Sequence, residues 1–403
     1  MRKIKLGMIG LGCRGYALLE TVAAVGQAEI TAVCDVYADR VRRCADRVKE
    51  LFGTSPAEYA DFRALLRDKN VEAVFIATPW NEHVRMATES LRAGKITAME
   101  VCGAADIEEC WELVRTYEQT KTPFMFMENC CYGKFEMLSE ALVRAGKLGT
   151  VVHCHGAYGH DLRDEILGGR VNRHYRLDNY RKRNGENYPT HELGPIAKLL
   201  EINHGNRMVS LVSVASKSAG LYEFSLTDKN PDASLRGAHF AQGDIVSTII
   251  TCANGETITL TLDTTLPRYY SREYTVRGTK GLCNQEANMV FLEGETDEHE
   301  FYDPNLTVKK YLDNAETYTD YIPQEWKDMT EAEKEAGHGG MDFLMFRDFL
   351  NAAATGRKMP VDVYDAAAWM CVTALSEQSV AQGGAPQSVP DFTRGKWIKK
   401  DWD

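Results

Sequence analysis

The sequence predicts an α/β domain with a doubly wound parallel sheet, followed by an α+β domain on a largely antiparallel, open-faced sheet. Over residues 1–129, short apolar runs alternate with amphipathic segments, and a glycine-rich turn follows the first run. From about residue 150, apolar residues instead alternate singly with polar ones. The chain of 403 residues is longer than one typical domain. We therefore expect one domain over 1–129 and a second over 130–403.

The opening of the chain predicts a dinucleotide site. An apolar run ends at Ile9, and a helical pattern covers residues 16–25. The turn between them contains Gly10, Gly12, Cys13, Arg14 and Gly15. Strand, tight turn and helix in this order bring free N–H groups and the positive helix end towards a pyrophosphate. The first domain is therefore expected to be a Rossmann domain.

An acidic residue supports this prediction and selects the cofactor. Asp35 ends the next apolar run, twenty residues beyond Gly15. A carboxylate in that place binds both hydroxyls of an adenosine ribose and repels a 2′-phosphate, which favours NAD over NADP.

The rest of the first domain continues to alternate strand and helix. Helical patterns cover residues 38–51, 61–66, 82–93 and 107–118, and apolar runs cover 73–78, 96–101 and 124–127. Right-handed crossovers then give a parallel sheet whose ligands lie at the carboxyl ends of the strands. Those ends carry Asp35, residues 78–83, Glu100 with Val101, and Asn129.

The second domain is predicted from alternating runs at 151–155, 245–250 and 257–262. The polar stretch 161–187 is too long for an ordinary connector, so we expect a binding loop there. It leads into residues 187–195, which enter a helix that ends near residue 200. Helices at 341–354 and 366–382 are expected to pack back on the first domain.

Composition restricts the partners. The formal net charge is −11, which argues against nucleic acid or an anionic membrane. The sequence contains no candidate membrane span, no signal-peptide pattern follows Met1, and the eleven cysteines form no CxxC pair. We therefore expect reduced thiols and a cytoplasmic protein. His153 and His155 share a strand face, but no further ligand at suitable spacing is visible, so no metal is predicted.

These features together resemble the Gfo/Idh/MocA oxidoreductase superfamily over essentially the whole chain. The resemblance rests on the glycine turn, Thr78-Pro79 followed by His83, the acidic strand end at Glu100, and the antiparallel second domain. Most dehydrogenases of that superfamily carry Glu-Lys-Pro at the fourth strand, and the lysine assists deprotonation of the substrate hydroxyl. Here the triplet is Glu100-Val101-Cys102. The missing lysine counts against a net sugar dehydrogenase.

Within that superfamily, the sequence resembles glycoside hydrolase family 109, the NAD-dependent α-N-acetylgalactosaminidases. The matching segments are 78–83, 99–101, 127–132, 156–163, 188–191 and 267–271. The resemblance implies that Arg14, Asp35, Trp80, Asn81, Glu82, His83, Glu100, Val101 and Asn129 line the NAD site. It also implies that Tyr158, Arg176, Tyr188, His191 and Tyr270 contact the sugar. One residue departs from the family pattern, because Glu192 stands where glycine is expected after His191.

The resemblance implies a redox-neutral hydrolysis of a small glycoside. NAD⁺ oxidises C3, the ketone acidifies the C2 proton, the aglycone leaves C1, water adds, and NADH returns the hydride. His191 and Tyr188 would act as bases, and Tyr158 would act on the departing oxygen. Arg176 or the nicotinamide would lower the pKa of a tyrosine base.

Other functions stay open at this point. They are a net NAD-dependent sugar dehydrogenase, a glycosidase for β-linked N-acetylgalactosamine, and a non-catalytic protein that uses NAD as structure. A conventional pair of catalytic carboxylates, Glu128 and Glu192, would leave the nucleotide motif unused. The open sheet face predicts a homo-oligomer.

Overall fold

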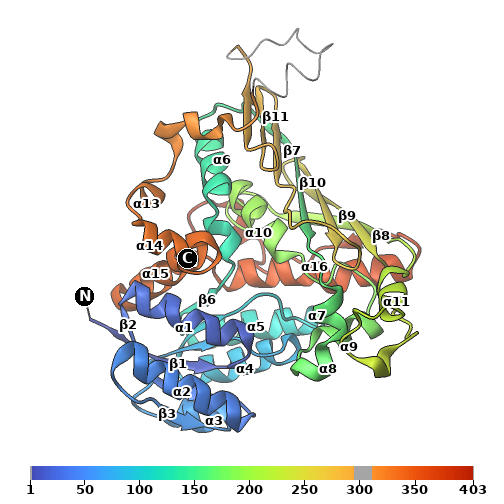
Figure 1. Cartoon of the computed structure of the whole chain (residues 1–403). Helices are drawn as coiled ribbons and strands as arrows, with labels where there is room; N and C mark the ends of the chain where they lie inside the picture. The colour runs from blue at the N-terminus through green and yellow to red at the C-terminus, as the bar shows by residue number, and fades with distance from the viewer. Residues whose placement is uncertain (1, 295–310, 403) are drawn as a thin grey trace. The chain divides into compact units, whose positions relative to one another are not determined.

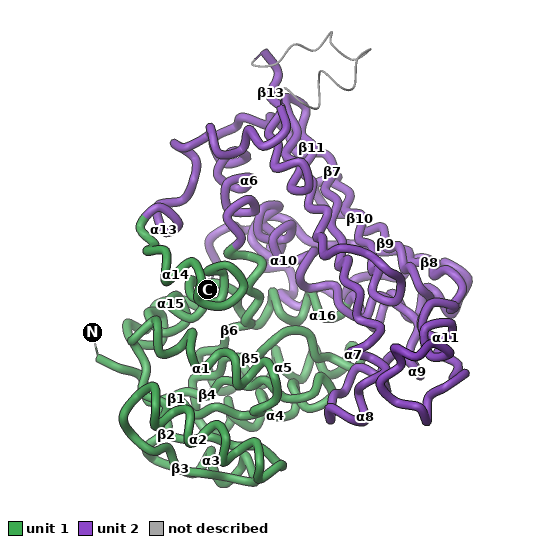
Figure 2. Tube along the Cα trace, viewed as in Figure 1, with its two compact units in different colours: residues 1–132, 328–371 green, residues 133–327, 372–403 purple. Residues whose placement is uncertain are grey.

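A computed structural model describes residues 2–294 and 311–402. The chain forms two compact units. Unit 1 comprises residues 1–132 and 328–371, and unit 2 comprises 133–327 and 372–403 (Figure 2). The first break therefore follows Tyr132 rather than residue 129, and 328–371 belongs to unit 1. Among the described helices, none combines the length and apolar character that a membrane crossing requires.

Unit 1 is built on a parallel sheet. Its strands are β1 (Ile4–Ile9), β2 (Ala28–Cys34), β3 (Ala57–Tyr59), β4 (Ala73–Ile76), β5 (Ile96–Met99) and β6 (Phe124–Phe126). In the described residues their order is β3-β2-β1-β4-β5-β6, and every pair is parallel (Figure 1). The order reverses at β1, which is the switch point of a doubly wound fold. The predicted Rossmann sheet is confirmed.

Helices connect these strands. They are α1 (Cys13–Val25), α2 (Ala38–Phe52), α3 (Phe62–Arg67), α4 (Trp80–Arg92) and α5 (Ile107–Thr120). α1 packs beside α2, and α4 packs beside α5, as right-handed crossovers on either side of β1 require. Asp61 and Asp106 cap α3 and α5 by accepting backbone N–H bonds.

A segment from the C-terminal part of the chain completes unit 1. It contains α14 (Glu331–Glu335), the 3₁₀ turn His338–Gly340, α15 (Met341–Thr355) and the first half of α16 (Val363–Ala381). α15 packs on α1 and β1. The Phe346 ring lies 5.1 Å from the Phe75 ring of β4, and Trp369 lies 6.2 Å from Phe126 of β6. The helix predicted at 341–354 therefore supplies core residues to the parallel sheet.

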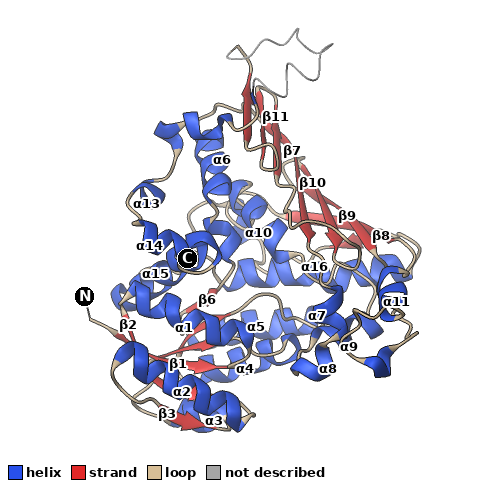
Figure 3. Ribbon diagram, viewed as in Figure 1, coloured by secondary structure: helices blue, strands red, loops and turns tan. Residues whose placement is uncertain are grey.

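Unit 2 is built on a second sheet (Figure 3). Its strands are β7 (Val151–Gly159), β8 (Met208–Ala215), β9 (Ile245–Cys252), β10 (Thr257–Asp263), β11 (Thr275–Gly278), β12 (Gly281–Asn284), β13 (Met289–Leu292) and β14 (Gln387–Ser388). In the described residues the order is β13-β12-β11-β7-β10-β9-β8-β14. β7 and β10 pair in parallel and the other pairs are antiparallel. The prediction of a largely antiparallel sheet is confirmed.

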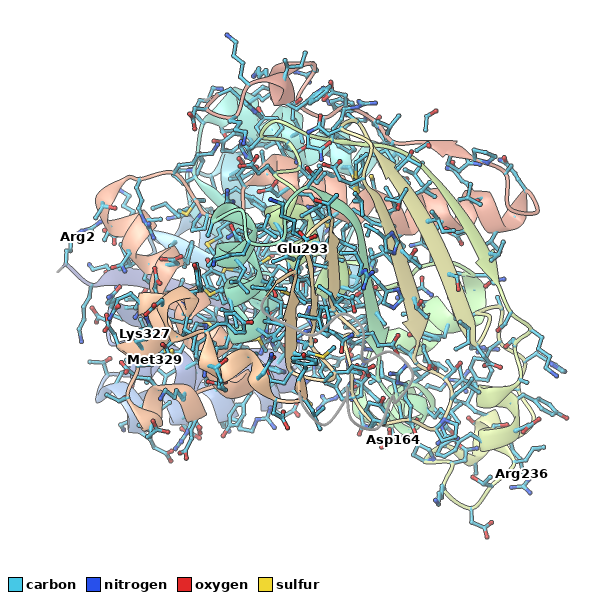
Figure 4. All side chains as sticks on the ribbon, turned by 90° about the horizontal axis from the view of Figure 1, so that it is seen from above. Arg2, Asp164, Arg236, Glu293, Lys327 and Met329 are labelled. Atoms are coloured by element: carbon cyan, nitrogen blue, oxygen red, sulfur yellow. The ribbon has the colours of Figure 1, made fainter. Side chains whose placement is uncertain are left out.

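The two faces of this sheet differ. Along β9 and β10 every second residue is buried, and α10 (Thr190–Leu199) packs against β7. Ile249 is 52% exposed and Val214 is 55% exposed, so apolar side chains remain on the open face. Figure 4 draws the side chains that extend from these strands. Unit 2 also contains α6 (Lys134–Arg144), α11 (Gly220–Ser225) and α13 (Gln324–Lys327).

The prediction of a loop at 161–187 is wrong, because short helices form in this segment. The segment forms α7 (Arg163–Leu167), α8 (Gly169–Asn172) and α9 (Arg176–Lys182). These helices are too short to show a full apolar period. Buried Ile166, Leu167 and Leu177 nevertheless anchor α7 and α9.

Candidate active site

The turn between β1 and α1 brings backbone segments too close for side chains at two glycines. Gly10 has a φ of 89°, and a Cβ there would lie 2.5 Å from the carbonyl oxygen of Ala77. A Cβ on Gly15 would lie 2.0 Å from the carbonyl oxygen of Gly10. Only glycine fits at both positions. α1 begins at Cys13, which is exposed.

Asp35 is held at the edge of this turn. Its Oδ2 accepts a hydrogen bond of 2.8 Å from the backbone N–H of Leu11, and its Oδ1 accepts one of 2.9 Å from Tyr37. Arg40 Nη1 lies 3.9 Å from Asp35 Oδ2. The carboxylate is therefore fixed where a ribose could approach it, with one cation beside it. Arg40 was not among the residues predicted from the sequence.

The loop after β4 contributes buried groups from α4. Trp80 and His83 are buried, whereas Asn81 is exposed and Glu82 pairs with Arg85 on its own helix. The Nδ1 of His83 lies 3.0 Å from the carbonyl oxygen of Cys102. Burial lowers the pKa of His83, so a neutral imidazole lies beneath the end of β5.

Three residues predicted for the NAD site form one polar network in unit 1. Arg14 Nε donates to Glu100 Oε1 over 2.7 Å. Both Nη atoms of Arg14 donate to Asp342, over 2.7 and 2.8 Å. Asn129 Nδ2 donates to the same carboxylate over 2.9 Å. Val101 is buried, and its N–H donates to Glu100 Oε2.

These residues fit a dinucleotide. The turn has no room for side chains where a pyrophosphate approaches, and a helix of 13 residues begins there. Asp35 is nearly buried at the end of β2, next to β1, where a ribose hydroxyl pair would meet it. Trp80, Glu100 and Asn129 follow three further strands, β4, β5 and β6, at the same edge of the sheet.

Unit 2 brings an aromatic cluster together at the entrance of α10. The Tyr188 hydroxyl lies 3.3 Å from His191 Nε2. The Tyr158 ring, near the end of β7, stacks on Tyr188 with centroids 4.4 Å apart, and it meets His191 edge-on at 5.5 Å. The Arg176 guanidinium of α9 lies 5.1 Å from the Tyr188 ring centroid.

The cluster continues towards Tyr270. The Tyr158 hydroxyl lies 3.4 Å from His160 Nδ1, and the His160 ring meets Tyr270 edge-on at 5.3 Å. Tyr270 is 49% exposed. All five residues predicted to contact sugar therefore lie in one continuous group, and His160, which the prediction left out of the site, connects two of them.

Burial and the Arg176 charge shift the pKa values of two residues in the cluster, Tyr158 and His160. Burial raises the pKa of Tyr158 well above the usual phenol value, although the Arg176 charge acts in the opposite direction. Burial lowers the pKa of His160, and Arg176 lowers it further. Tyr158 is therefore a protonated donor at neutral pH, and His160 is an uncharged imidazole.

Comparison with known proteins places this geometry in a family. Residues 132–399 match the C-terminal domain of glycosyl hydrolase 109, and residues 4–127 match the NAD-binding Rossmann fold of the Gfo/Idh/MocA oxidoreductase family. The chain is 36% identical to an α-N-acetylgalactosaminidase of Tannerella forsythia, over 98% of this chain and 88% of that one. The chain belongs to glycosyl hydrolase family 109.

Further relatives support the assignment. A family 109 protein of Solibacter usitatus is 37% identical over 98% of this chain and 89% of its own. Among solved structures, levoglucosan dehydrogenase in complex with NADH and levoglucosan superposes with a TM-score of 0.70 at 18% identity, covering 97% of this chain and all of that one. This second likeness shows the fold. The family 109 chain is thus a glycoside hydrolase that uses NAD.

The family 109 chain also contains site residues that were not predicted from the sequence. Asp342 joins Arg14 to Asn129, although it lies more than 200 residues away in the sequence. Glu186 is fully buried, and its Oε1 accepts the backbone N–H of Tyr188 over 3.4 Å. Burial raises the pKa of Glu186 to about 8. The glycine-rich segment before Asp342 was a possible signal, and Glu186 had none.

Glu192, the departure from the family pattern, packs against the sheet. It is 1% exposed, and its Cβ lies 2.8 Å from where a Cβ on Gly156 would be. Because Gly156 of β7 has no side chain, it leaves the space that Glu192 of α10 occupies. On the other face of β7, His153 pairs with Thr257 and His155 with Glu273.

Proposed function

We propose that this chain releases terminal α-linked N-acetylgalactosamine from small glycosides by transient oxidation at C3. The contact between Tyr188 and His191, with Tyr158 stacked on the pair, carries the proposal. These three side chains offer two proton acceptors and one protonated donor beside the Arg176 cation. The name of the Tannerella forsythia relative supports the sugar and the anomer.

The glycine turn, Asp35 and the Arg14 network would hold NAD. When bound, NAD would supply the redox chemistry, as acceptor and later donor of the hydride from C3 of the sugar. A C3 ketone makes the neighbouring C2 proton acidic, which opens elimination of the group on C1. Val101 stands where a lysine assists many dehydrogenases of the fold, so His191 takes over deprotonation of the C3 hydroxyl.

Residues of unit 2 carry out the other proton transfers. Tyr188 removes the C2 proton, with the Arg176 guanidinium 5.1 Å from its ring centroid. Tyr158 donates its proton to the glycosidic oxygen as the C1–O bond breaks, and the electron pair leaves with the aglycone. Water then adds its hydroxide at C1 and returns a proton to Tyr158. Reprotonation of C2 by Tyr188, and of the C3 oxygen by His191, completes hydrolysis without net redox change.

The test uses purified holoprotein with matched α- and β-linked N-acetylgalactosaminide chromophores and no added cofactor. Release of the α-linked chromophore without accumulation of NADH absorbance supports the proposal. Faster release of the β-linked chromophore would contradict the proposed preference for the α-anomer. NADH formed in proportion to oxidised free sugar, with no chromophore release after NAD⁺ is added, would identify a net sugar dehydrogenase.

A further inference from the structure

The chain adopts an unusual backbone just before α15. Gly337, His338, Gly339 and Gly340 have φ values of 62°, 43°, 64° and 91°. For the non-glycine residue, His338, the left-handed region costs energy, and such conformations persist where the surrounding structure requires them. Positive φ at four consecutive residues therefore indicates that the surrounding structure requires this backbone geometry before α15.

The backbone of residues 337–340 positions the Asp342 carboxylate, which lies in the first turn of α15. Its side chain is completely buried. It accepts two hydrogen bonds from Arg14, one from Asn129, and a contact of 2.7 Å from His338 Nδ1. A single carboxylate thus joins α1, the end of β6 and its own loop.

The loop fits α1 closely. A Cβ on Gly337 would lie 2.7 Å from Asp342 Oδ2 and 2.8 Å from Thr21 Oγ1. Glycine is therefore required at this position both for its φ and for space. His338 is more than half exposed, so it covers the network from the solvent side.

The network stays charged at neutral pH. Burial acts to raise the pKa of Asp342, but the hydrogen bonds from Arg14 and His338 outweigh it and hold the pKa well below its usual range. Arg14 in turn has a carboxylate at two edges of its guanidinium group, Glu100 at Nε and Asp342 at both Nη atoms. Its position is fixed by bidentate geometry.

We propose that Asp342 is a positioning residue for the dinucleotide, and that residues 337–340 exist to place it. Asp342 touches no reacting atom. It fixes Arg14 and Asn129 beside the glycine turn, so the C-terminal part of the chain determines how tightly NAD is held. This inference concerns cofactor binding and does not depend on which glycoside is cleaved.

The test compares Asp342→Asn with Asp348→Asn in the full-length protein. Asp348 lies on the same helix and pairs with Tyr132 and Arg357 away from the network. The readouts are NAD content per chain after gel filtration and the Kd for NADH from nicotinamide fluorescence. We expect Asp342→Asn to weaken NADH binding at least tenfold, and Asp348→Asn to leave the Kd unchanged.

Two further measurements separate positioning from simple structural damage. With saturating NAD⁺, Asp342→Asn should recover most of its kcat with an unchanged KM for the glycoside. In the double variant Arg14→Gln/Asp342→Asn, the loss of NADH affinity should be smaller than the losses of the two single variants combined. If Asp342→Asn fails to fold, His338→Ala removes one partner and should weaken NADH binding severalfold. Wild-type NADH affinity in the folded variant, or additive effects in the double variant, would overturn the proposal.

Discussion

The hydroxyl of Tyr188 lies 3.3 Å from Nε2 of His191, three residues further along the entrance of α10. Pro189 lies between them, and α10 begins at Thr190. The helical spacing places both side chains on one face. The pair therefore needs no distant element to bring its two members together.

Removal of the Tyr188 hydroxyl should abolish most turnover. Tyr188→Phe keeps the ring that stacks on Tyr158 but removes the proton acceptor, so we expect kcat to fall by about 10²–10⁴. Tyr222→Phe, on the exposed ring that stacks on His239, is the matched control. Equal kcat values for the two variants in chromophore release would contradict the role of Tyr188.

Asp35 should set the choice between NAD and NADP. Asp35→Asn keeps an acceptor for the Leu11 N–H but removes the negative charge that repels a 2′-phosphate, and the Arg40 guanidinium lies near enough to attract one. We expect the ratio of the Kd for NADPH to that for NADH to fall at least tenfold. Asp46→Asn, on the exposed side of α2, should leave the ratio unchanged. An unaltered ratio in Asp35→Asn would show that another group selects the cofactor.

Glu186 should make stability depend on pH. Its pKa is raised to about 8 in the folded chain from an ordinary value of 4.5. Between these values the folded state keeps a proton that the unfolded state has lost, so stability falls by about 1.4 kcal/mol per pH unit as pH rises. Glu186→Gln removes this loss. We expect its Tm to exceed that of the wild type at pH 9 and to approach it near pH 4.5. Parallel Tm curves would contradict the raised pKa.

We propose that the open sheet face associates with a second copy of this chain. Val214 and Ile249 are diagonal neighbours on paired strands β8 and β9, and both are about half exposed. Ile249→Glu should therefore shift the protein to a smaller mass by light scattering. Val171→Glu, at an exposed valine on α8, provides the control. An unchanged mass for Ile249→Glu would exclude this face.

Much of the fold followed from local patterns. Apart from β3, the described strands of the parallel sheet follow apolar runs, and the end of each run could be predicted from the glycine, proline or acid that follows it. β3 was not predicted because its residues, Ala57 to Tyr59, are largely exposed and carry no apolar pattern. The short helices of 161–187 were missed for a related reason, since a single turn or two cannot display the helical period.

In the candidate site, too, contacts between sequence neighbours could be predicted, whereas contacts between distant residues could not. Tyr188 and His191 are neighbours in sequence, so their contact was predictable. Asp342 was not, because its role depends on contacts with Arg14 and Asn129 that only the folded chain creates. Glu192, the departure from the family pattern, packs against β7 in the space that Gly156 leaves, a contact that no local pattern indicates. The cytoplasmic location stays a prediction.

The most direct test of the proposed mechanism is the fate of the C2 hydrogen in D₂O. The released sugar, analysed by NMR, should carry deuterium at C2 and retain hydrogen at C3, while no NADH accumulates. Such a pattern requires both removal of the C2 proton and internal return of the C3 hydride. A sugar released with its C2 hydrogen intact would contradict the account, because direct displacement at C1 leaves that bond untouched.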